Sequence, residues 1–451
     1  MDIKNDIDCL RSLRQSENNN GDKIIRDFFE EGSFAELGTF VTSPAGNIEP
    51  VICGYGAVDG KLVYSFIEVF EREKGAFGAA SAKKICNTVE LAKKNGAPLV
   101  AFFDSAGARV SEGLSVLDSY GSVMKAIADA QGLIPRIAVV NGVCSGAAAV
   151  IAKMFDVVIA AGDKAEMFIN PPFLFDAKEK ALFADITADS MTGACGKIKQ
   201  ILDFIAADEY YISDDLNRKT PELESVLSGS YKIASVLDVL CGSGGYAEIF
   251  DRDAPEAFTG LINIGNMAVG IAANNPSEKD GALTVGAAVK IKKMVSLCAA
   301  FDIPLLTLVD TCGYDYSDGA DKSMYDLPFS ELAREYAFAQ NPMLTVILGR
   351  AYGSAATLLA SKALGADLVY AVSGADISTM PPESAVQFLY GDKIKEASDP
   401  NGERNRLLGE YKKNNSSPAA AAGSGIIDDI IEYDSLRQRI ISAFEMLKNG
   451  R

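Results

Sequence analysis

The chain has 451 residues, with 43 lysines and arginines, 61 aspartates and glutamates, and a formal net charge of −18. Nucleic acids and anionic membranes attract basic surfaces, so this charge argues against both as partners. With 48% hydrophobic and 23% charged residues the composition is that of a soluble globular protein, and the length allows two large domains. The first residues have no apolar core of the kind a secretory signal needs, and we therefore expect a cytoplasmic protein.

The chain contains no histidine. This excludes Ser-His-Asp catalytic triads, Cys-His catalytic dyads and acid–base catalysis by imidazole. Its eight cysteines are scattered singly and form no Cys-x-x-Cys pair, so the sequence predicts neither a zinc site nor a disulfide framework. Chemistry in this chain must rest on backbone dipoles, carboxylates, lysines, tyrosines or a bound cofactor.

In chain order, the first half alternates strands with helices. Residues 54–69 form a predicted hairpin around Asp59 and Gly60, because an Asp-Gly pair supplies the positive φ angles of a two-residue turn. A helix is predicted over 81–96, ended by Gly96, and a buried parallel strand begins at Pro98. Further predicted elements are a helix over 120–130, a buried strand over 134–142, a helix over 144–155 and strands within 156–169.

The second half repeats the first. Asp104 aligns with Asp310, an offset of 206 residues. A second stretch of similarity further along each half aligns Gly146 with Gly353. A repeat of this length indicates a duplicated domain, since solenoid units have roughly 20 to 50 residues. The order of elements predicts α/β units with parallel strands and right-handed crossovers in both halves, followed by a final helix within 433–450.

Domain boundaries follow from the repeat. We expect an N-terminal helical extension over residues 1–45, an N-terminal domain over 46–225 and a C-terminal domain over 226–451. The polar segment 211–229 contains a proline and is typical of a linker between the two domains.

Small residues form a matched pair of turns, at 144–148 and at 352–356, and each turn follows a buried strand and precedes a helix. Free amide N–H groups and the positive end of the helix dipole converge at such a turn. Two amides aimed at one developing negative oxygen form an oxyanion hole. A single turn of this kind more often reflects close packing of helix on strand, but its duplication at matching positions favours function.

Several blocks of sequence together resemble one family. DSAGARVSEG, NGVCSGAAA, EMFINPP, LVDTCGY, RAYGSAA and SKALGADLVYA, which fall between residues 45 and 435, are similar to the acyl-CoA carboxyltransferases of the crotonase-like superfamily. That family includes the β subunit of propionyl-CoA carboxylase and the α subunits of methylmalonyl-CoA and glutaconyl-CoA decarboxylases. The resemblance implies an α/β fold made of two duplicated crotonase-like (ClpP/crotonase) domains.

The implied activity is transfer of a carboxyl group between biotin, carried on a separate protein, and the α-carbon of a short-chain acyl-CoA of the propionyl or methylmalonyl type. The N-terminal domain is the acyl-CoA side and the C-terminal domain is the biotin side. The family mechanism needs no side-chain base. Residues implied as catalytic are Gly146, Ala147, Ser354 and Ala355; as substrate-binding, Ala106, Gly107, Ala108, Arg109, Gly353 and Thr357; and as cofactor-binding, Gly313, Tyr314 and Tyr352.

The resemblance also implies partners. The chain has neither the AMKM attachment sequence for biotin nor a P-loop for ATP, so a biotin carboxyl carrier protein is expected, with a biotin carboxylase or a membrane decarboxylase subunit. A family whose site lies between domains of neighbouring subunits must at least dimerise, and a homo-oligomer, dimer or hexamer, is expected.

Two other functions remain open from the sequence. A crotonase-like hydratase or isomerase working without biotin would need a carboxylate pair, for which Glu112 and Glu166 are the local candidates. A non-catalytic assembly subunit is the other alternative, because the glycine pairs of the family are replaced here by small residues with side chains.

Charged residues near the glycine turns have two possible roles each. Arg109 either binds a CoA phosphate or fixes its loop through Glu112. Asp104 and Asp310 end corresponding strands, where a carboxylate either acts in catalysis or caps the following turn, and we expect the capping role.

Overall fold

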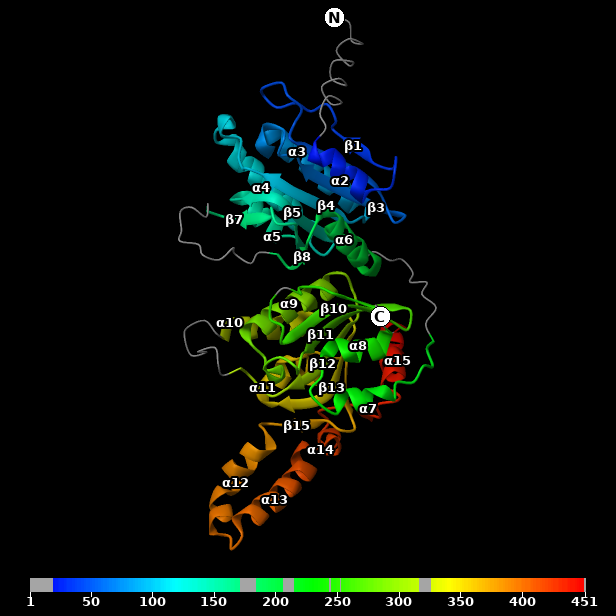
Figure 1. Ribbon diagram of the computed structural model, residues 1–451, viewed down its shortest axis with the longest axis vertical. Helices are drawn as coiled ribbons and strands as arrows, with labels where there is room; N and C mark the ends of the chain where they lie inside the picture. Colours follow the sequence, from blue (N-terminus) through cyan, green and yellow to red (C-terminus); the bar gives the residue numbers. More distant parts are fainter. Residues whose placement is uncertain are drawn as a thin grey trace, which may run out of the picture. The chain divides into compact units, whose positions relative to one another are not determined.

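The computed structural model describes residues 19–170, 184–205, 215–242, 245–251, 253–315 and 326–449. The chain divides into two compact units, Met1–Asp208 and Glu209–Arg451 (Figure 1). Of the segment expected as a linker, residues 211–214 lie outside the described part of the chain. The remainder includes a short helix, α7 (Glu222–Leu227), in the second unit.

The first unit is built on one twisted sheet. Its strands run in the order β1-β2-β3-β4-β5-β6-β8, and β7 pairs with the end of β5. The first three strands are antiparallel to one another and the others pair in parallel. The bounds are β1 Ala35–Leu37, β2 Val51–Val58, β3 Lys61–Glu68, β4 Leu99–Ser105, β5 Arg136–Ser145, β6 Val157–Ala161, β7 Glu166–Phe168 and β8 Ile186–Ala188.

The second unit repeats this sheet strand for strand. Its order is β9-β10-β11-β12-β13-β14-β16, and β15 pairs with the end of β13. The bounds are β9 Tyr246–Glu248, β10 Ala257–Ile264, β11 Met267–Asn274, β12 Leu305–Thr311, β13 Met343–Tyr352, β14 Leu368–Val372, β15 Asp376–Ser378 and β16 Asp429–Ile431. The duplication predicted from the sequence is therefore confirmed at the level of topology.

Strand register is repeated as well. Leu99 pairs with Arg136 in the first sheet, and Leu305 pairs with Met343 at the corresponding place in the second. Both sheets also shift register near the carboxyl end of this strand pair. A bulge that recurs in both copies re-aims the chain that follows it, which here is the loop and turn of the candidate site.

Helices connect the strands in both units, as the sequence predicted. In the first, the helix expected over 120–130 begins earlier, at Ser115. The bounds are α2 Asn20–Phe28, α3 Ala79–Asn95, α4 Ser115–Ala128, α5 Ala147–Lys153 and α6 Met191–Ile205 in the first unit, and α8 Ile233–Cys241, α9 Val285–Ala300, α10 Asp326–Phe338, α11 Gly353–Leu358, α12 Pro382–Glu396, α13 Pro400–Tyr411, α14 Pro418–Gly423 and α15 Leu436–Asn449 in the second.

Local sequence explains the predicted turn at Asp59 and Gly60 and the predicted helix end at Gly96. Asp59 and Gly60 both have positive φ angles, 48° and 75°, and join β2 to β3 in a two-residue turn. Gly96 takes the left-handed conformation after α3, and its amide donates to carbonyls of the last turn. Both features follow from residue types that tolerate positive φ, which is why the sequence was sufficient to place them.

Each face of the first sheet is covered by its own helices. One face packs against α3, α4 and α5, with Phe66, Phe103 and Val140 buried among their apolar side chains. The other face packs against α2 and α6, where Phe28 of α2 meets Phe102 edge to face at 5.5 Å. Burial of each such side chain stabilises the fold by about 1.5 to 3 kcal/mol.

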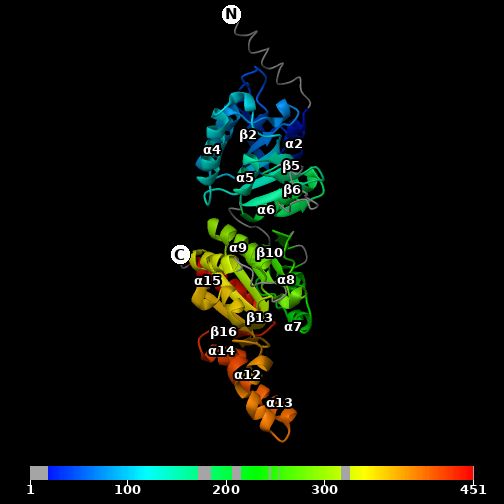
Figure 2. The same cartoon turned by 90° about the vertical axis from the view of Figure 1, so that its left-hand side faces the viewer.

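The hairpin of α12 and α13 extends from the end of the second sheet, as Figures 1 and 2 both show. It has a small core of its own, formed by five buried residues: Ala385, Val386, Ile394, Leu407 and Tyr411. Among the described residues, no helix is both long and apolar enough to cross a membrane.

Candidate active site

The first small-residue turn lies where β5 passes into α5. Gly146 has φ 58° and ψ −124°, a backbone conformation that a residue with a side chain rarely adopts, so glycine is required here. The Gly146 amide donates to the carbonyl of Phe168 at 2.9 Å. Of the two amides expected to face a substrate oxygen, that of Gly146 is therefore used inside the domain. The Ala147 amide, at the first residue of α5, has no acceptor within its own helix.

The glycine loop after β4 lies beside this turn. Gly107 has φ 112°, and a side chain there would lie 3.5 Å from the hydroxyl of Ser145, the residue before Gly146. The loop is held by backbone hydrogen bonds, from Phe77 to Gly107 at 2.9 Å and from Arg109 to Phe77 at 2.7 Å. The predicted substrate-binding loop and the first turn are thus neighbours, and Ala106 and Ala108 are exposed on it.

The second turn lies where β13 passes into α11, and it borders a cavity. Gly353 has φ 65°. Ser354 and Thr357 are exposed while Ala355 is fully buried, so the two sequence-predicted residues of this turn differ in access. The cavity has a volume of about 410 Å³ and is lined by small and apolar residues and by hydroxyl and amide side chains: Val309, Thr345, Ile347, Ala351, Gly353, Ser354, Ala356, Thr357, Leu359, Ser361, Val369, Ile377, Ser378, Thr379, Asn415 and Ile426.

The second glycine loop repeats the geometry of the first. Gly313 has φ 124°. Its amide donates to the hydroxyl of Thr311 at 3.2 Å, and its carbonyl accepts from the Leu283 amide at 2.9 Å. Tyr314 packs edge to face on Phe329, with ring centroids 4.9 Å apart. This loop is held in place by the same bonds as its counterpart.

Tyr352 ends β13 immediately before the second turn. Its ring is buried and its hydroxyl donates to Asp376 at 2.9 Å. Burial, followed by the Asp376 carboxylate, raises the pKa of Tyr352 well above its usual range. The phenol therefore stays protonated and serves as a hydrogen-bond donor to Asp376.

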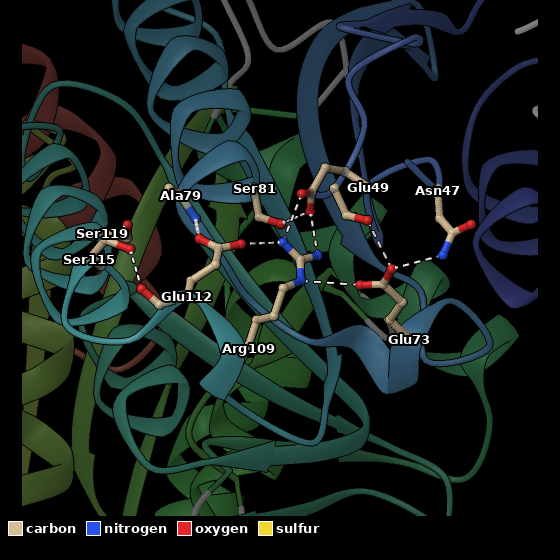
Figure 3. Close-up of polar contacts among 10 residues, drawn as sticks. Asn47, Glu49, Glu73, Ala79, Ser81, Arg109, Glu112, Ser115 and Ser119 are labelled. Atoms are coloured by element: carbon tan, nitrogen blue, oxygen red, sulfur yellow. Dashed lines mark hydrogen bonds and ion pairs between the residues drawn. The ribbon is translucent and has the colours of Figure 1, made fainter. Parts of the chain in front are cut away.

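Arg109 is surrounded by three carboxylates (Figure 3). Its guanidinium donates to Glu49 at 2.9 and 3.0 Å, to Glu73 at 3.1 Å and to Glu112 at 2.6 Å. The Arg109 side chain is 8% exposed and that of Glu49 is 0% exposed, so the pair is shielded from water. These contacts engage all three nitrogens of the guanidinium group. They fit the second role considered for Arg109, which is to fix its loop, and they leave no nitrogen directed at a CoA phosphate.

Glu112 completes this cluster and joins the loop to the next helix. One carboxylate oxygen accepts from Arg109 and the other accepts from the Ala79 amide at the start of α3, at 2.8 Å. Hydrogen bonds from Ala79 and Arg109 outweigh burial and lower the pKa of Glu112. Glu166, the other carboxylate of the hydratase alternative, is exposed on β7, where it pairs with Val143. Glu112 is therefore a structural ligand of Arg109 rather than a free acid or base.

The sequence predicted that Asp104 and Asp310 cap the turns that follow them, and the structure shows that this prediction is wrong. The Asp104 carboxylate accepts from the Val143 amide of the neighbouring strand at 3.1 Å, and Asp310 accepts from the Arg350 amide at 3.1 Å. Gly142 precedes Val143, and a side chain on it would overlap the Asp104 carboxyl group. The strand bulge brings the neighbouring strand within reach, so each carboxylate joins two strands.

The cavity contains residues that sequence reasoning missed. Asn415 and Ile426 come from the segment after α13, and Thr379 follows β15. Nothing in the local sequence marks Asn415 or Ile426, because their position depends on the return of the chain to β16. In the described ranges, no group of three or more histidine, cysteine, aspartate or glutamate residues is placed to hold a metal ion.

Comparison with known proteins agrees with this architecture. The carboxyl transferase domain model matches residues 18–200 and 183–451. The chain is 32% identical to the methylmalonyl-CoA decarboxylase subunit alpha of Propionigenium modestum, over 94% of this chain and 89% of that protein. It is 34% identical to a putative propionyl-CoA carboxylase beta chain of Bacillus subtilis, over 93% of this chain and 88% of that protein.

A solved structure shows the same fold. Transcarboxylase 12S, described as a hexamer assembly with methylmalonyl-coenzyme A and methylmalonic acid bound, superimposes with a TM-score of 0.90 at 28% identity, covering 98% of this chain and 91% of that chain. The prediction of two duplicated crotonase-like domains is confirmed. With the family model matching both halves and relatives above 30% identity along nearly the whole chain, the protein belongs to the carboxyl transferase family.

Proposed function

We propose that this protein is a biotin-dependent carboxyltransferase, which moves a carboxyl group between carboxybiotin on a separate carrier protein and the α-carbon of a short-chain acyl-CoA of the propionyl or methylmalonyl type. The observation that supports this most is the matched pair of strand–glycine–helix turns at Gly146 and Gly353, one in each domain of a chain in this family. Enolate and deprotonated ureido groups are both planar oxygen-centred anions, so one turn design suits both.

The first turn is the proposed acyl-CoA side. Removal of an α-proton or a carboxyl group leaves negative charge on the thioester oxygen, and an amide at a helix start stabilises such charge. In this chain the Ala147 amide is the available donor, since that of Gly146 is bound to Phe168. The exposed residues of the loop at 106–108 lie next to this turn and are proposed to line the thioester path.

The second turn is the proposed biotin side. Its cavity of about 410 Å³ is lined by apolar side chains, including Ile347 and Ile377, and by the hydroxyl groups of Ser354 and Ser378. An apolar bicyclic ring with a polar ureido edge fits this lining. Bound there, biotin would carry the carboxyl group and, once that group has left it, would accept the α-proton of the substrate. The protein's part is to hold the ureido oxygen near the helix start at Ser354 and Ala355 and to keep water out.

No side-chain base is required in this proposal, which is consistent with a chain that has no histidine. The hydratase alternative needs a free carboxylate pair, and Glu112 is bound to Arg109 and the Ala79 amide. The contacts of Glu112 therefore favour carboxyl transfer over hydration.

We further propose that the protein works as a homo-oligomer with a biotin carboxyl carrier protein and a biotin carboxylase or membrane decarboxylase subunit. Support comes from large apolar side chains left exposed on both units. Val110, Leu114 and Leu117 next to the first glycine loop are 86%, 84% and 68% exposed, and Phe388 on α12 is 80% exposed. Exposed apolar groups that gather in this way mark surfaces that other chains cover. Cysteines that are free in the described chain suit a cytoplasmic location, where thiols stay reduced.

The test is decarboxylation of malonyl-type CoA esters by the purified protein with free biotin added. We expect biotin-dependent loss of methylmalonyl-CoA with formation of propionyl-CoA, abolished by avidin. Crotonyl-CoA with the same preparation is the control for hydratase activity. Hydration of crotonyl-CoA that survives avidin, without any biotin-dependent decarboxylation, would contradict the proposal.

A further inference from the structure

The second domain has a long connection between two strands that is short in the first, and this connection reaches the cavity beside the Gly353 turn. From β15 to β16 the chain passes through residues 379–428, whereas from β7 to β8 it has only residues 169–185. The longer connection contains α12, α13 and α14. Three of its residues line the cavity of about 410 Å³: Thr379, Asn415 and Ile426. The two matched turns therefore differ in what surrounds them.

Asn415 lies in a short π-helix, η6 (Lys412–Ser416), which directly follows α13. A π-helix has about one residue more per turn than an α-helix. Tyr411, the last residue of α13, is buried, and in a continued α-helix Asn415 would lie on the same face, one turn further on. Because of the extra residue, Ser416 occupies that buried position and is 1% exposed, whereas Asn415 is exposed. The π-helix therefore keeps Asn415 out of the packed core and at the cavity.

Asn415 differs chemically from the other polar side chains that line the cavity. Those are hydroxyl groups: Thr345, Ser354, Thr357, Ser361, Ser378 and Thr379. Two of them are already bonded, Thr345 to the Ala360 carbonyl at 2.7 Å and Ser378 to the Tyr411 hydroxyl at 3.2 Å. Asn415 alone in this lining has a carboxamide, with an NH2 donor and a carbonyl acceptor. No other side chain among the described lining residues offers a donor and an acceptor side by side.

We propose, on the basis of the proposed function, that Asn415 recognises the ureido group of biotin and determines which of its two nitrogens faces the acyl-CoA. A cyclic urea holds each N–H beside its C=O group, and a carboxamide matches that edge with one donor and one acceptor. The NH2 group of Asn415 donates to the ureido oxygen, and the Asn415 carbonyl accepts from one ureido N–H. The nitrogen that carries the carboxyl group is then the one that points away from Asn415.

This contact also explains how two turns of one design serve different partners. The carbonyl oxygen of Asn415 needs a hydrogen-bond donor opposite it, which a ureido group has and a thioester enolate lacks. An enolate placed in the second cavity would bring its negative oxygen against that carbonyl, and such a mismatch rejects the wrong partner. Asn415 therefore makes the second cavity selective for biotin, while the turn at Gly146 remains the acyl-CoA side.

The experiment measures binding of free biotin to the full chain by equilibrium dialysis, together with KM for biotin in the decarboxylation of methylmalonyl-CoA. Asn415→Asp keeps the size of the side chain but replaces its donor by a charged oxygen opposite the ureido oxygen. We expect the Kd and the KM for biotin to rise about tenfold or more. Asn414→Asp makes the same charge change at the exposed neighbour in η6 and should leave both constants near wild type. Equal Tm values confirm that the variants fold.

A second ligand tests the pairing itself. In 2-iminobiotin a protonated imino group replaces the ureido oxygen, so the edge opposite Asn415 presents N–H donors and a positive charge. Wild type should bind it more weakly than biotin. The carboxylate of Asn415→Asp accepts from two such donors, and this variant should prefer 2-iminobiotin to biotin. A reversed preference is not a result that structural damage produces.

Two results would overturn the role of Asn415 alone. One is a wild type that binds biotin and decarboxylates with it, while Asn415→Asp has the same Kd and the same ligand preference. The other is an equal loss of binding in Asn414→Asp, which would assign the effect to charge near the cavity. A wild type that neither binds biotin nor shows biotin-dependent decarboxylation would overturn the carboxyltransferase proposal and the role of Asn415 with it.

Discussion

Asp310 joins β12 to β13 through Arg350, whose backbone amide and Nε both donate to the same carboxylate oxygen, at 3.1 and 2.9 Å. The corresponding carboxylate of the first domain, Asp104, has only the amide bond to Val143 from that strand. The two domains share a scaffold contact, and the second has added a side-chain contact to it.

This difference predicts unequal effects of one substitution. Asp310→Ala removes the partner of the buried Tyr231 hydroxyl and one of the two carboxylates bound by the Arg350 guanidinium, which keeps Asp280. We expect it to lower the free energy of unfolding by about 3 kcal/mol. Asp104→Ala, which removes one amide bond, should cost about 1 kcal/mol. Denaturant unfolding measures both, and equal losses would show that the side-chain contacts of Asp310 add nothing.

Glu68 predicts a pH dependence of stability. It is buried at the end of β3, and burial raises its pKa to about 8. The folded protein therefore binds a proton that the unfolded chain loses near pH 4.5, so the unfolding free energy falls as pH rises from about 4.5 to 8. The counterpart of Glu68 in the second domain is the neutral Asn274, which is also buried.

Glu68→Gln should remove this slope. Since one pKa unit is worth about 1.4 kcal/mol, the variant should gain several kcal/mol relative to wild type at pH 8 and show little difference at pH 4.5. Urea unfolding at several pH values measures it, with the exposed Glu71→Gln as control. A difference that does not change with pH would contradict a protonated Glu68.

Substitutions of Arg109 and Glu49 should have coupled effects on the free energy of unfolding. Arg109→Met leaves the fully buried Glu49 carboxylate without its cation, at a cost of about 3 to 5 kcal/mol. Arg109→Met combined with Glu49→Gln should recover part of this loss, because the most buried of the three carboxylates is then neutral, while Glu73 and Glu112 keep their charges. Chemical unfolding of the two singles and the double gives the coupling energy. Additive effects would mean that the two side chains do not interact.

Substitution of a glycine in either turn should reduce activity more than it reduces stability. Gly353→Ala forces a side chain into a positive φ angle, costs about 1 to 3 kcal/mol of stability, and moves the amides that follow. Displacement of an oxyanion donor lowers kcat about 100-fold or more. Gly96→Ala, at the positive φ after α3, is the control: a similar loss of stability should leave kcat near wild type. Retained kcat in Gly353→Ala would argue against the second oxyanion hole.

The exposed apolar residues beside the first glycine loop predict self-association. Leu114→Glu with Leu117→Glu places two charges on a surface that we expect another copy to cover, and light scattering should show a smaller assembly than wild type. Leu133→Glu changes a leucine that is 62% exposed elsewhere in the same domain, and it should leave the assembly intact. An unchanged mass for the double variant would exclude this surface from the interface.

The amino-acid sequence by itself determined the repeated architecture, the turn at Asp59 and Gly60, the helix end at Gly96 and the positions of the two small-residue turns. These features depend on local backbone preference and on the spacing of apolar residues, and both can be read without knowing which strands pair.

Only the tertiary structure decided the partners of the polar groups. Arg109 turned out to lie against Glu49, sixty residues away, Asp104 to bond to the next strand, and Asn415 to reach the cavity at Gly353. Such contacts are made by side chains from elements that are distant in sequence, and their positions depend on sheet order, register and bulges.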